Sequence, residues 1–329
     1  MTGGPVALHL SVVIPTHNGS HRITPLLRAL ASQSFEAARM DVVIVDNGST
    51  DGSAERVAAD PAFRLLSATR AARIVALDRP GLTHARVEGV RASSGDIVLF
   101  LDDDTEPERE CCAEALAPFE DARVGVVFGR VFPKYTTPPH PSIRKREGIL
   151  AINHGLGSTP IVWKEPRDFA PTLGVGLAVR RTAFVDAYPW REPHRVLPDR
   201  VGTRMISGGD LEIGQFLARA GWWRTYNPRM VIHHLIDPAR LRVRSFMRLI
   251  VGIERSRATF EDKFSLGPSA SVRRLKAARD ALAIAAAAPW WMLTRDGPRG
   301  WCFALASRAG RLAGAYSGRR LARDAAAPR

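Results

Sequence analysis

The sequence has few features of a disulfide-linked, secreted or membrane-spanning protein. Its three cysteines, Cys111, Cys112 and Cys302, form an adjacent pair and a distant single residue, which matches neither a disulfide framework nor a metal-binding spacing. The uncharged stretch 281–293 has 13 residues, whereas a helix that spans a membrane needs about 20. The first residues lack the basic segment of a secretory signal and lead directly into a predicted strand. We therefore expect a protein of the reducing cytoplasm.

Two common nucleotide-binding motifs are also missing. No GxGxxG follows the first apolar segment, and no GxxxxGK[ST] occurs in the chain. The first absence argues against a dinucleotide-binding fold, and the second argues against a P-loop. A bound nucleotide would therefore have to be held by other groups.

Positive charge is concentrated in the C-terminal part of the chain. The formal net charge is +14, and residues 238–329 contain 19 Lys and Arg against 6 Asp and Glu, whereas residues 1–237 contain 28 against 27. This imbalance predicts a neutral domain, residues 1–237, joined to a basic tail, residues 238–329. A basic tail favours an anionic partner, either nucleic acid or a negatively charged membrane surface.

Short apolar segments alternate with amphipathic segments along the first 130 residues. Nearly every residue of the apolar segments is hydrophobic, as in strands that are buried on both faces. Such strands alternating with helices indicate an α/β fold with a doubly wound, mostly parallel sheet flanked by helices. Ligands of such a sheet bind beyond the carboxyl ends of its strands. We predict strands at residues 10–14, 42–45, 74–77, 97–101 and 124–128, and helices at 21–33, 83–92 and 107–119.

Three carboxylates, Asp102, Asp103 and Asp104, follow the apolar strand 97–101. Like charges at the end of a buried strand repel one another and lose hydration, so they need a cation or hydrogen-bond donors. A hard divalent metal shared with a phosphate-bearing ligand meets that need. The alternative is an exposed strand end followed by a helix whose first turn, residues 105–108, supplies an N-cap threonine, two acids and a proline.

Several motifs occur in the order found in a known family. They are PTHN (15–18), VDNGSTDGS (45–53), GLTHARVEGVRASSGD (81–96) and LFLDDD (99–104), followed by SGGDLE (207–212) and NPRMVIHH (227–234). Over about residues 8–237 the chain resembles glycosyltransferase family 2. The resemblance implies the GT-A fold, with a nucleotide-sugar half at about 8–130 and an acceptor half at about 131–237.

The resemblance also implies a donor site at the strand ends. Pro15, Thr16, Asn18 and Asp46 would hold the base and ribose of a nucleotide-diphospho-sugar. Arg86 would contact the same donor, and Val87 follows it where the family often has asparagine.

The three acids would have different roles in this site. Asp102 would face the ribose, Asp104 would bind a divalent metal, either magnesium or manganese, and Asp103 would occupy the variable middle position of the donor site. His234 would be a further contact to the metal or the diphosphate, with His233 as the alternative.

Asp210 matches the general base of the family, and Gly209 precedes it where the family commonly has glutamate. A carboxylate beside a sugar site can take the proton from an acceptor hydroxyl as that hydroxyl attacks. Glu212 lies in the same predicted helix turn, where we expect it to complement the helix dipole.

The basic tail is predicted to be helical. Residues 240–260 place apolar side chains on one face and arginines on the others. The uncharged stretch 281–293 contains Trp290 and Trp291 and lies between basic segments, as in helices that lie in a membrane interface. The alternative is a helical lid that packs on the catalytic domain.

The resemblance, together with these features, implies an inverting, non-processive glycosyltransferase that transfers a sugar from a nucleotide-diphospho-sugar to an acceptor hydroxyl. By analogy we expect a lipid-linked or glycan acceptor in cell-surface polysaccharide or glycolipid assembly, at the inner face of the cell membrane. The favoured partner of the tail is an anionic membrane surface rather than nucleic acid. The chain lacks the QxxRW motif and the spanning helices of a processive synthase. The second hypothesis is a non-catalytic module that keeps the fold and binds nucleic acid or a protein partner through the tail.

Overall fold

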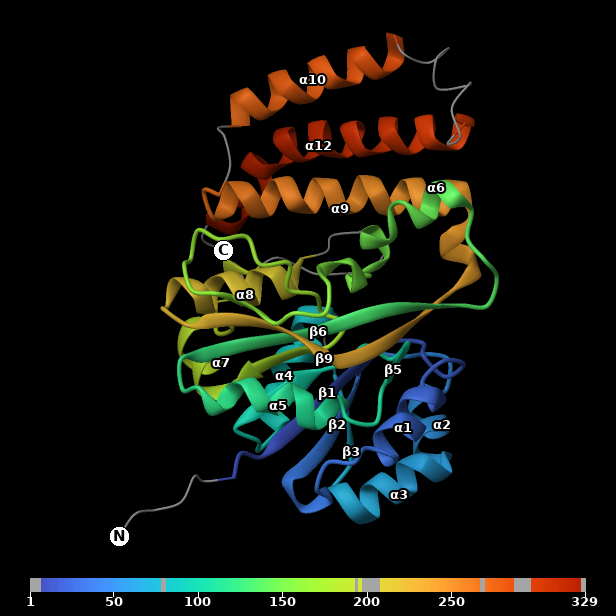
Figure 1. Ribbon diagram of the computed structural model, residues 1–329, viewed down its shortest axis with the longest axis vertical. Helices are drawn as coiled ribbons and strands as arrows, with labels where there is room; N and C mark the ends of the chain where they lie inside the picture. Colours follow the sequence, from blue (N-terminus) through green and yellow to red (C-terminus); the bar gives the residue numbers. More distant parts are fainter. Residues whose placement is uncertain are drawn as a thin grey trace. The chain divides into compact units, whose positions relative to one another are not determined.

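The structure is a computed structural model that describes residues 7–77, 81–192, 195–196, 208–266, 270–286 and 297–326. The chain divides into two compact units, whose elements are labelled in Figure 1. The first unit contains Met1–Lys134, Ala151–Arg191 and Ile213–Leu235. The second unit contains Tyr135–Leu150, Glu192–Glu212 and Ile236–Arg329.

A nine-stranded sheet forms the centre of the first unit (Figure 1). Its strand order is β3-β2-β1-β4-β8-β6-β9-β5, and β7 pairs with β9. The neighbours in β3-β2-β1-β4 are parallel, whereas β8 is antiparallel to β4 and β6, and β9 is antiparallel to β5 and β7. The strands are β1 (Leu10–Thr16), β2 (Met40–Asp46), β3 (Arg73–Ala76), β4 (Ile97–Phe100), β5 (Thr105–Pro107), β6 (Val124–Tyr135), β7 (Ile161–Trp163), β8 (Leu177–Arg180) and β9 (Trp223–Ile236).

The parallel strands are buried as their apolar sequences predict. Every residue of β1 and of β4 is buried. Thr16 pairs with Asp46 across β1 and β2, and the Leu101 amide donates to the Val13 carbonyl at 3.1 Å. The residues that follow β1, β2 and β4 therefore reach the same edge of the sheet.

Helices flank this sheet, so the predicted α/β class is confirmed. One of them, α4, lies so close to β1 that a Cβ atom on Gly89 would be 2.1 Å from Val13 Cγ1. Glycine at this position permits the close approach. The helices are α1 (Thr24–Ala31), α2 (Ser53–Ala59), α3 (Pro61–Arg70), α4 (Leu82–Ala92), α5 (Cys111–Leu116), α7 (Arg181–Ala187) and α8 (Gly209–Arg219).

The predicted helix 107–119 is wrong at its start. Thr105–Pro107 form the edge strand β5, which pairs with β9, and the helix begins only at Cys111. Thr105 is buried and its hydroxyl donates to the Asp102 carbonyl at 2.7 Å, so Thr105 closes the acidic turn and does not cap a helix. The alternative of an exposed acidic helix start is therefore wrong. Pairing with a strand so far along the chain leaves no trace in the local pattern.

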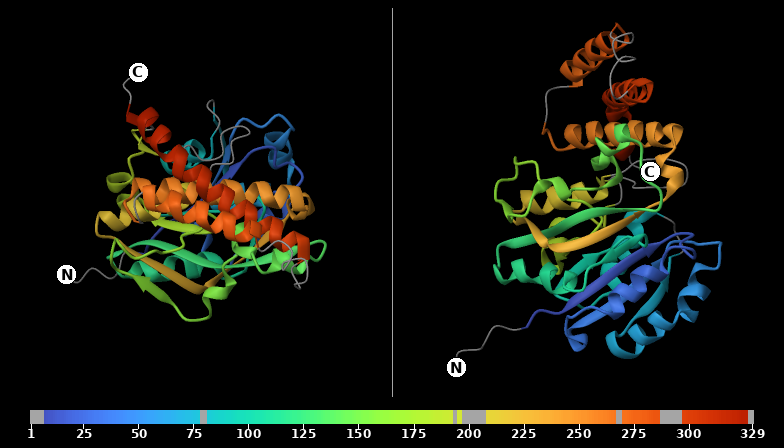
Figure 2. Two further views of the ribbon diagram at one scale, coloured as in Figure 1. Left: turned by 90° about the horizontal axis from the view of Figure 1, so that it is seen from above. Right: turned by 45° about the vertical axis from the view of Figure 1, so that its right-hand side comes forward.

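The second unit contains three long helices in its described residues, α9 (Val243–Lys263), α10 (Ala270–Ala286) and α12 (Gly297–Ala326), and α12 packs against the other two (Figure 2). A short helix, α6 (Pro141–Arg144), precedes them. The helix predicted at 240–260 is confirmed as α9, and its Phe246 ring lies 4.9 Å from that of Phe303 in α12. None of the helices searched in the described residues is long and apolar enough to cross a membrane. Trp290 and Trp291 lie outside the described residues.

Candidate active site

The loops that follow β1 and β2 are joined by hydrogen bonds. The side-chain oxygen of Asn18 accepts from the Thr50 amide at 2.8 Å, and the Asn18 amide donates to Ser49 Oγ at 3.0 Å. The Ser49 amide in turn donates to Asp46 Oδ1 at 3.0 Å. Asn18 has a φ of 52°, a left-handed conformation that asparagine adopts more readily than most residues. The structure thus brings Asn18 and Asp46 into one polar rim.

Asp103 is buried and contacts residues of the loop that follows β1. Arg22 Nε lies 2.7 Å from Asp103 Oδ1, and the Thr16 hydroxyl, next to Pro15 at the end of β1, donates to Asp103 Oδ2 at 2.7 Å. A Cβ atom on Gly19 would lie 2.4 Å from Asp103 Oδ2, so the turn needs glycine there. Burial raises the pKa of the Asp103 carboxyl, and the Arg22 guanidinium acts against that rise. The carboxylate therefore fixes the loop after β1 to the acidic turn.

Arg86 and Asp102 also lie together. Helix α4 places an Arg86 guanidinium nitrogen 3.9 Å from Asp102 Oδ1. Arg86 is only 4% exposed, and its guanidinium carbon lies 5.9 Å from the centre of the Phe100 ring. Because its charge is held in a buried position, Arg86 can attract an anionic group to the end of β4 more strongly than a solvated arginine could.

Asp104 and His234 are brought together by β5 and β9. Thr105 pairs with His234, and the Leu235 amide donates to the Asp104 carbonyl at 2.8 Å. This pairing places His234 Nε2 3.4 Å from Asp104 Oδ1, and His234 is only 2% exposed.

His233 has different neighbours from His234. Its Nε2 lies 3.0 Å from Glu108 Oε1, and its ring stacks on Phe132 with centroids 5.9 Å apart. Successive side chains of a strand point to opposite faces of the sheet, which explains the difference. Of the two histidines, His234 is the one that lies beside the acidic turn.

The residues around Asp104 suit a hard divalent ion that also binds a phosphate. Within the part of the chain that the structure describes, no group of three or more His, Cys, Asp or Glu side chains could hold a metal ion by itself. Asp104 and His234 would supply one carboxylate and one imidazole, and magnesium is typically bound by one or two carboxylates together with substrate phosphates and water. Carboxylate oxygen is also a suitable ligand for manganese.

Asp210 lies in the first turn of α8, together with Glu212. Asp210 is half-buried, whereas Glu212 is fully buried and forms an ion pair with Lys263 of α9. The prediction that Glu212 only complements the helix dipole is therefore incomplete, because a buried carboxylate needs a nearby cation.

Two cations that pair with buried acids were not predicted from the sequence: Arg22 in the first unit and Lys263 in the second. Arg22 lies 81 residues from its partner Asp103, and Lys263 lies 51 residues from Glu212. Arg22 lies four residues after the PTHN motif, and this nearness could have indicated that it belongs to the donor site. Lys263 is the one lysine of the segment 243–263, but no sequence motif marks it as the partner of Glu212.

Comparison with known proteins identifies the family. The family model described as glycosyl transferase family 2 matches residues 11–183, which is more than half of the chain. The glycosyltransferase AglE of Haloferax volcanii is 29% identical over 235 residues, which are 70% of this chain and 67% of that protein. The poly(ribitol-phosphate) beta-N-acetylglucosaminyltransferase TarS of Staphylococcus aureus is 30% identical over 121 residues, 37% of this chain and 20% of that protein.

A solved structure shares the fold. The mannosyltransferase PcManGT from Pyrobaculum calidifontis, determined in complex with GDP-Man and Mn2+, superposes with a TM-score of 0.62 at 17% identity, over 95% of this chain and 89% of that one. The predicted GT-A fold is thereby confirmed. The chain belongs to glycosyltransferase family 2.

Proposed function

We propose that the chain binds a nucleotide-diphospho-sugar at the ends of β1, β2 and β4 and transfers the sugar to an acceptor hydroxyl with inversion, one sugar at each encounter. The observation that carries this proposal is the pairing of Asp104 with His234, at 3.4 Å, beside Asp102 in the same turn. The mannosyltransferase structure with GDP-Man and Mn2+ supports a nucleotide-sugar and a divalent metal as the ligands here.

Each side chain of the rim would have a distinct part in donor binding. Pro15, Thr16, Asn18 and Asp46 would hold the base and ribose, Asp102 would face the ribose, and Arg86 would attract the diphosphate. Asp104 and His234 would hold the metal, which when bound stabilises negative charge on the leaving diphosphate. Asp103, whose oxygens accept from Arg22 and Thr16, would contribute to the donor site by fixing the acidic turn.

Asp210 would be the general base of the transfer. The acceptor oxygen forms a bond to the anomeric carbon while the bond from that carbon to the diphosphate oxygen breaks, and the hydroxyl proton passes to the Asp210 carboxylate. The diphosphate leaves with the electron pair of the broken bond. A single displacement inverts the anomeric configuration and needs no covalent sugar intermediate.

Donor hydrolysis tests this proposal without knowledge of the acceptor. The full-length protein is incubated with a panel of nucleotide-diphospho-sugars and Mg2+ or Mn2+, and released nucleoside diphosphate is measured. We expect slow release from one donor, which stops in EDTA and returns with added metal. Donor binding without any release would contradict the proposal and favour the non-catalytic binding module.

The same assay tests the base. Asp210→Asn should retain donor binding and lower nucleoside diphosphate release by about 10²- to 10⁴-fold, because the amide cannot accept the proton of the attacking water. Undiminished release by this variant would exclude Asp210 as the base.

We further propose that the second unit brings the enzyme to an anionic membrane surface, at the inner face of the cell membrane, where a lipid-linked or glycan acceptor is used in cell-surface polysaccharide or glycolipid assembly. The support comes from α10, which exposes Val272, Leu275 and Leu282 by 51%, 74% and 73%. Their spacing of three and seven residues places them on one helical face.

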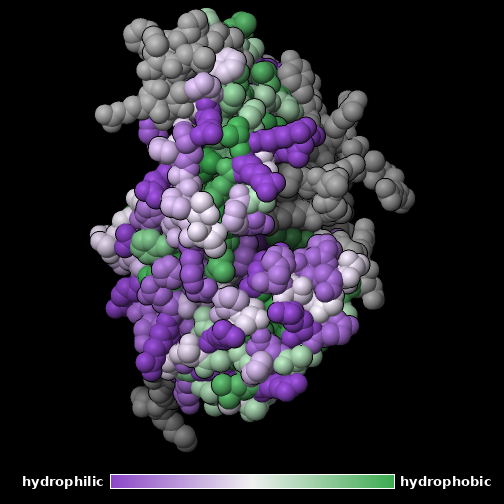
Figure 3. Space-filling view, turned by 90° about the vertical axis from the view of Figure 1, so that its right-hand side faces the viewer, coloured by the Kyte–Doolittle hydropathy of each residue, from purple (hydrophilic) through white to green (hydrophobic). Residues whose placement is uncertain are grey.

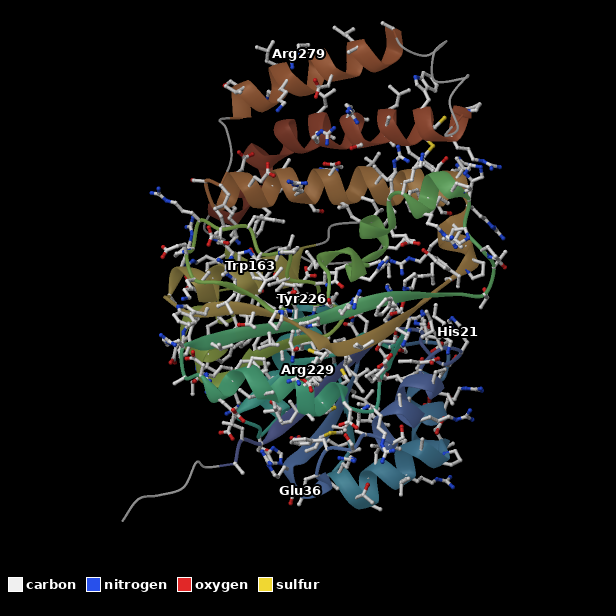
Figure 4. The ribbon with its side chains drawn as sticks, viewed as in Figure 1. His21, Glu36, Trp163, Tyr226, Arg229 and Arg279 are labelled. Carbon is white, nitrogen blue, oxygen red and sulfur yellow. The ribbon has the colours of Figure 1, made fainter. Side chains whose placement is uncertain are left out.

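Cations border this aliphatic face. Lys276 and Arg279 are exposed on α10, and Figure 4 labels Arg279 on that helix. Figure 3 shows hydrophobic residues among hydrophilic ones on the face of the C-terminal helices that it draws. Exposed aliphatic residues beside lysine and arginine are typical of helices that lie in the interface of an anionic bilayer.

A further inference from the structure

Lys263, at the end of α9, forms a buried ion pair with Glu212, in the first turn of α8. Glu212 has no exposed surface, and its Oε1 accepts from the Lys263 ammonium group, which also donates to the Arg195 carbonyl. A carboxylate removed from water is costly unless a cation compensates its charge. Lys263 supplies that charge, and it is the single lysine in a helix whose other cations are arginines.

The end of α9 holds Lys263 in place. Phe260 and Phe264 flank it in the sequence, are 3% and 2% exposed, and have ring centroids 4.9 Å apart. The Lys263 ammonium nitrogen lies 5.5 Å from the centre of the Phe264 ring. The helix itself packs against α12. Lys263 is thus presented by a packed element, which allows its position to be transmitted to Glu212.

Glu212 shares a helical turn with Asp210. The Glu212 amide donates to the Gly208 carbonyl at 2.9 Å, so the backbone from residue 208 to residue 212 forms one closed turn. A shift of the Glu212 side chain therefore acts on the backbone that carries Asp210. Gly208 has a φ of 121°, a left-handed backbone conformation that favours glycine at the entry to α8.

We propose that Lys263 is a positioning residue for sugar transfer, which holds the first turn of α8 through Glu212 and thereby sets the position of the Asp210 carboxylate. This inference rests on the proposed function of Asp210 as the base. The basic C-terminal segment would then be part of the transfer machinery as well as a site of membrane contact.

The first test is Lys263→Met, which removes the ammonium group and keeps an unbranched side chain. We expect kcat for nucleoside diphosphate release from the donor to fall about 10- to 100-fold, as a small displacement of a catalytic group can cause, with KM for the donor unchanged because the proposed donor-binding residues belong to the first unit. Lys263→Arg keeps the charge and should retain most of the kcat. An unchanged kcat in Lys263→Met overturns the proposal.

Arg257→Met is the matched control. Arg257 is a cation of the same helix, and its partner is Glu261 of that helix, at 3.0 Å in an exposed pair. Its removal should leave kcat and KM unchanged. An equal loss of kcat in this control would show that removing any positive charge from α9 lowers kcat. That result would overturn the specific role of Lys263.

A double variant separates positioning from stability. Replacing both members of a buried ion pair by apolar residues of similar volume often leaves stability unchanged. In Glu212→Met/Lys263→Met we therefore expect a Tm close to that of the unsubstituted chain and a kcat that stays low. If kcat recovers together with Tm, Lys263 only stabilises the fold and the proposal fails. If Lys263→Met does not fold, the double variant gives the same comparison.

Asp210→Asn, measured in parallel, distinguishes failure of the proposed base from failure of the positioning role of Lys263. If Asp210→Asn transfers normally, the proposed base is wrong and Lys263 has nothing to position. If Asp210→Asn is inactive while Lys263→Met transfers normally, the proposed function stands and only the positioning role fails.

Discussion

The two units hold their charges in different ways. In the first unit, the acids near the sheet edge lie beside cationic or imidazole groups, as Asp103 does beside Arg22 and Asp104 beside His234. In the second unit, buried Glu212 has a cation partner, but the C-terminal segment 238–329 carries 19 basic residues against 6 acidic ones. Internal pairs cannot balance that excess.

This difference predicts different kinds of ligand. The acids at the sheet edge of the first unit have nearby cationic or imidazole partners. This arrangement favours a ligand whose own charges offset each other, such as a diphosphate together with a divalent metal. A helical segment with more cations than acids favours an extended anionic partner, and exposed aliphatic side chains on α10 favour a lipid surface. The first unit would accordingly bind the donor, and the second would bind the membrane.

The largest effect is expected where the metal would bind. Asp104→Asn would remove one of the two proposed metal contacts and should lower the rate of nucleoside diphosphate release about 10³-fold, because charge on the leaving diphosphate would be less stabilised. The rate is measured as nucleoside diphosphate release at saturating Mn2+. Asp121→Asn is the control, since Asp121 lies in an exposed pair with Arg123. Equal rates for Asp104→Asn and Asp121→Asn would remove Asp104 from the metal site.

The next largest effect is expected on stability, from the ion pair between Arg22 and the buried Asp103 in the first unit. Arg22→Met leaves the buried Asp103 carboxylate without its cation and should lower the free energy of unfolding by about 3 kcal/mol, measured by urea denaturation. Arg123→Met breaks a pair with the same 2.7 Å separation at the surface and should cost less than about 1 kcal/mol. Equal costs would show that burial does not distinguish the two pairs.

A smaller effect is expected for the exposed aliphatic residues of α10 in the second unit. Leu275→Gln/Leu282→Gln should lower binding to anionic liposomes by about tenfold, because two aliphatic side chains no longer leave water. Binding is measured by co-sedimentation, with Leu65→Gln as the control, since Leu65 is 51% exposed on α3 of the first unit. Undiminished sedimentation of the α10 variant would place the lipid contact elsewhere, and salt-sensitive binding to RNA or DNA would favour nucleic acid as the partner.

The mildest probe compares thiols in the two units. Burial raises the pKa of the Cys112 thiol to about 12 and raises the pKa of the Cys111 thiol well above its usual range, whereas Cys302 of the second unit is partly exposed. At pH 8 an aromatic disulfide reagent should therefore react with one thiol in the native protein and with three in urea. Rapid reaction of all three in the native state would contradict the packing of α5.

Local sequence patterns predicted most of the parallel half of the fold. The apolar runs at residues 10–14, 42–45 and 97–101 became buried strands because burial on both faces requires such runs. The strand at 105–107 was missed, since its pairing with β9 depends on residues more than a hundred positions away. Composition placed a boundary near residue 237, yet the segments Tyr135–Leu150 and Glu192–Glu212 group with the C-terminal helices through tertiary contacts.

The candidate site was predictable to the extent that motifs mark it. The motif order indicated Asp102, Asp104 and His234, and the structure places Asp104 beside His234. The cations Arg22 and Lys263 could not be predicted, because their partners are brought beside them by tertiary packing and no motif marks either residue. The roles of Asp102, Asp104 and His234 in transfer are predictions, which the variants described above would test.

The most direct test of the central claim is the anomeric configuration of the sugar released by donor hydrolysis. With water as the acceptor, proton NMR spectra recorded in the first minutes, before the free sugar equilibrates, identify the first-formed anomer. A single displacement predicts the anomer opposite to that of the donor, together with nucleoside diphosphate in equal amount. A first-formed anomer with the configuration of the donor would contradict the account.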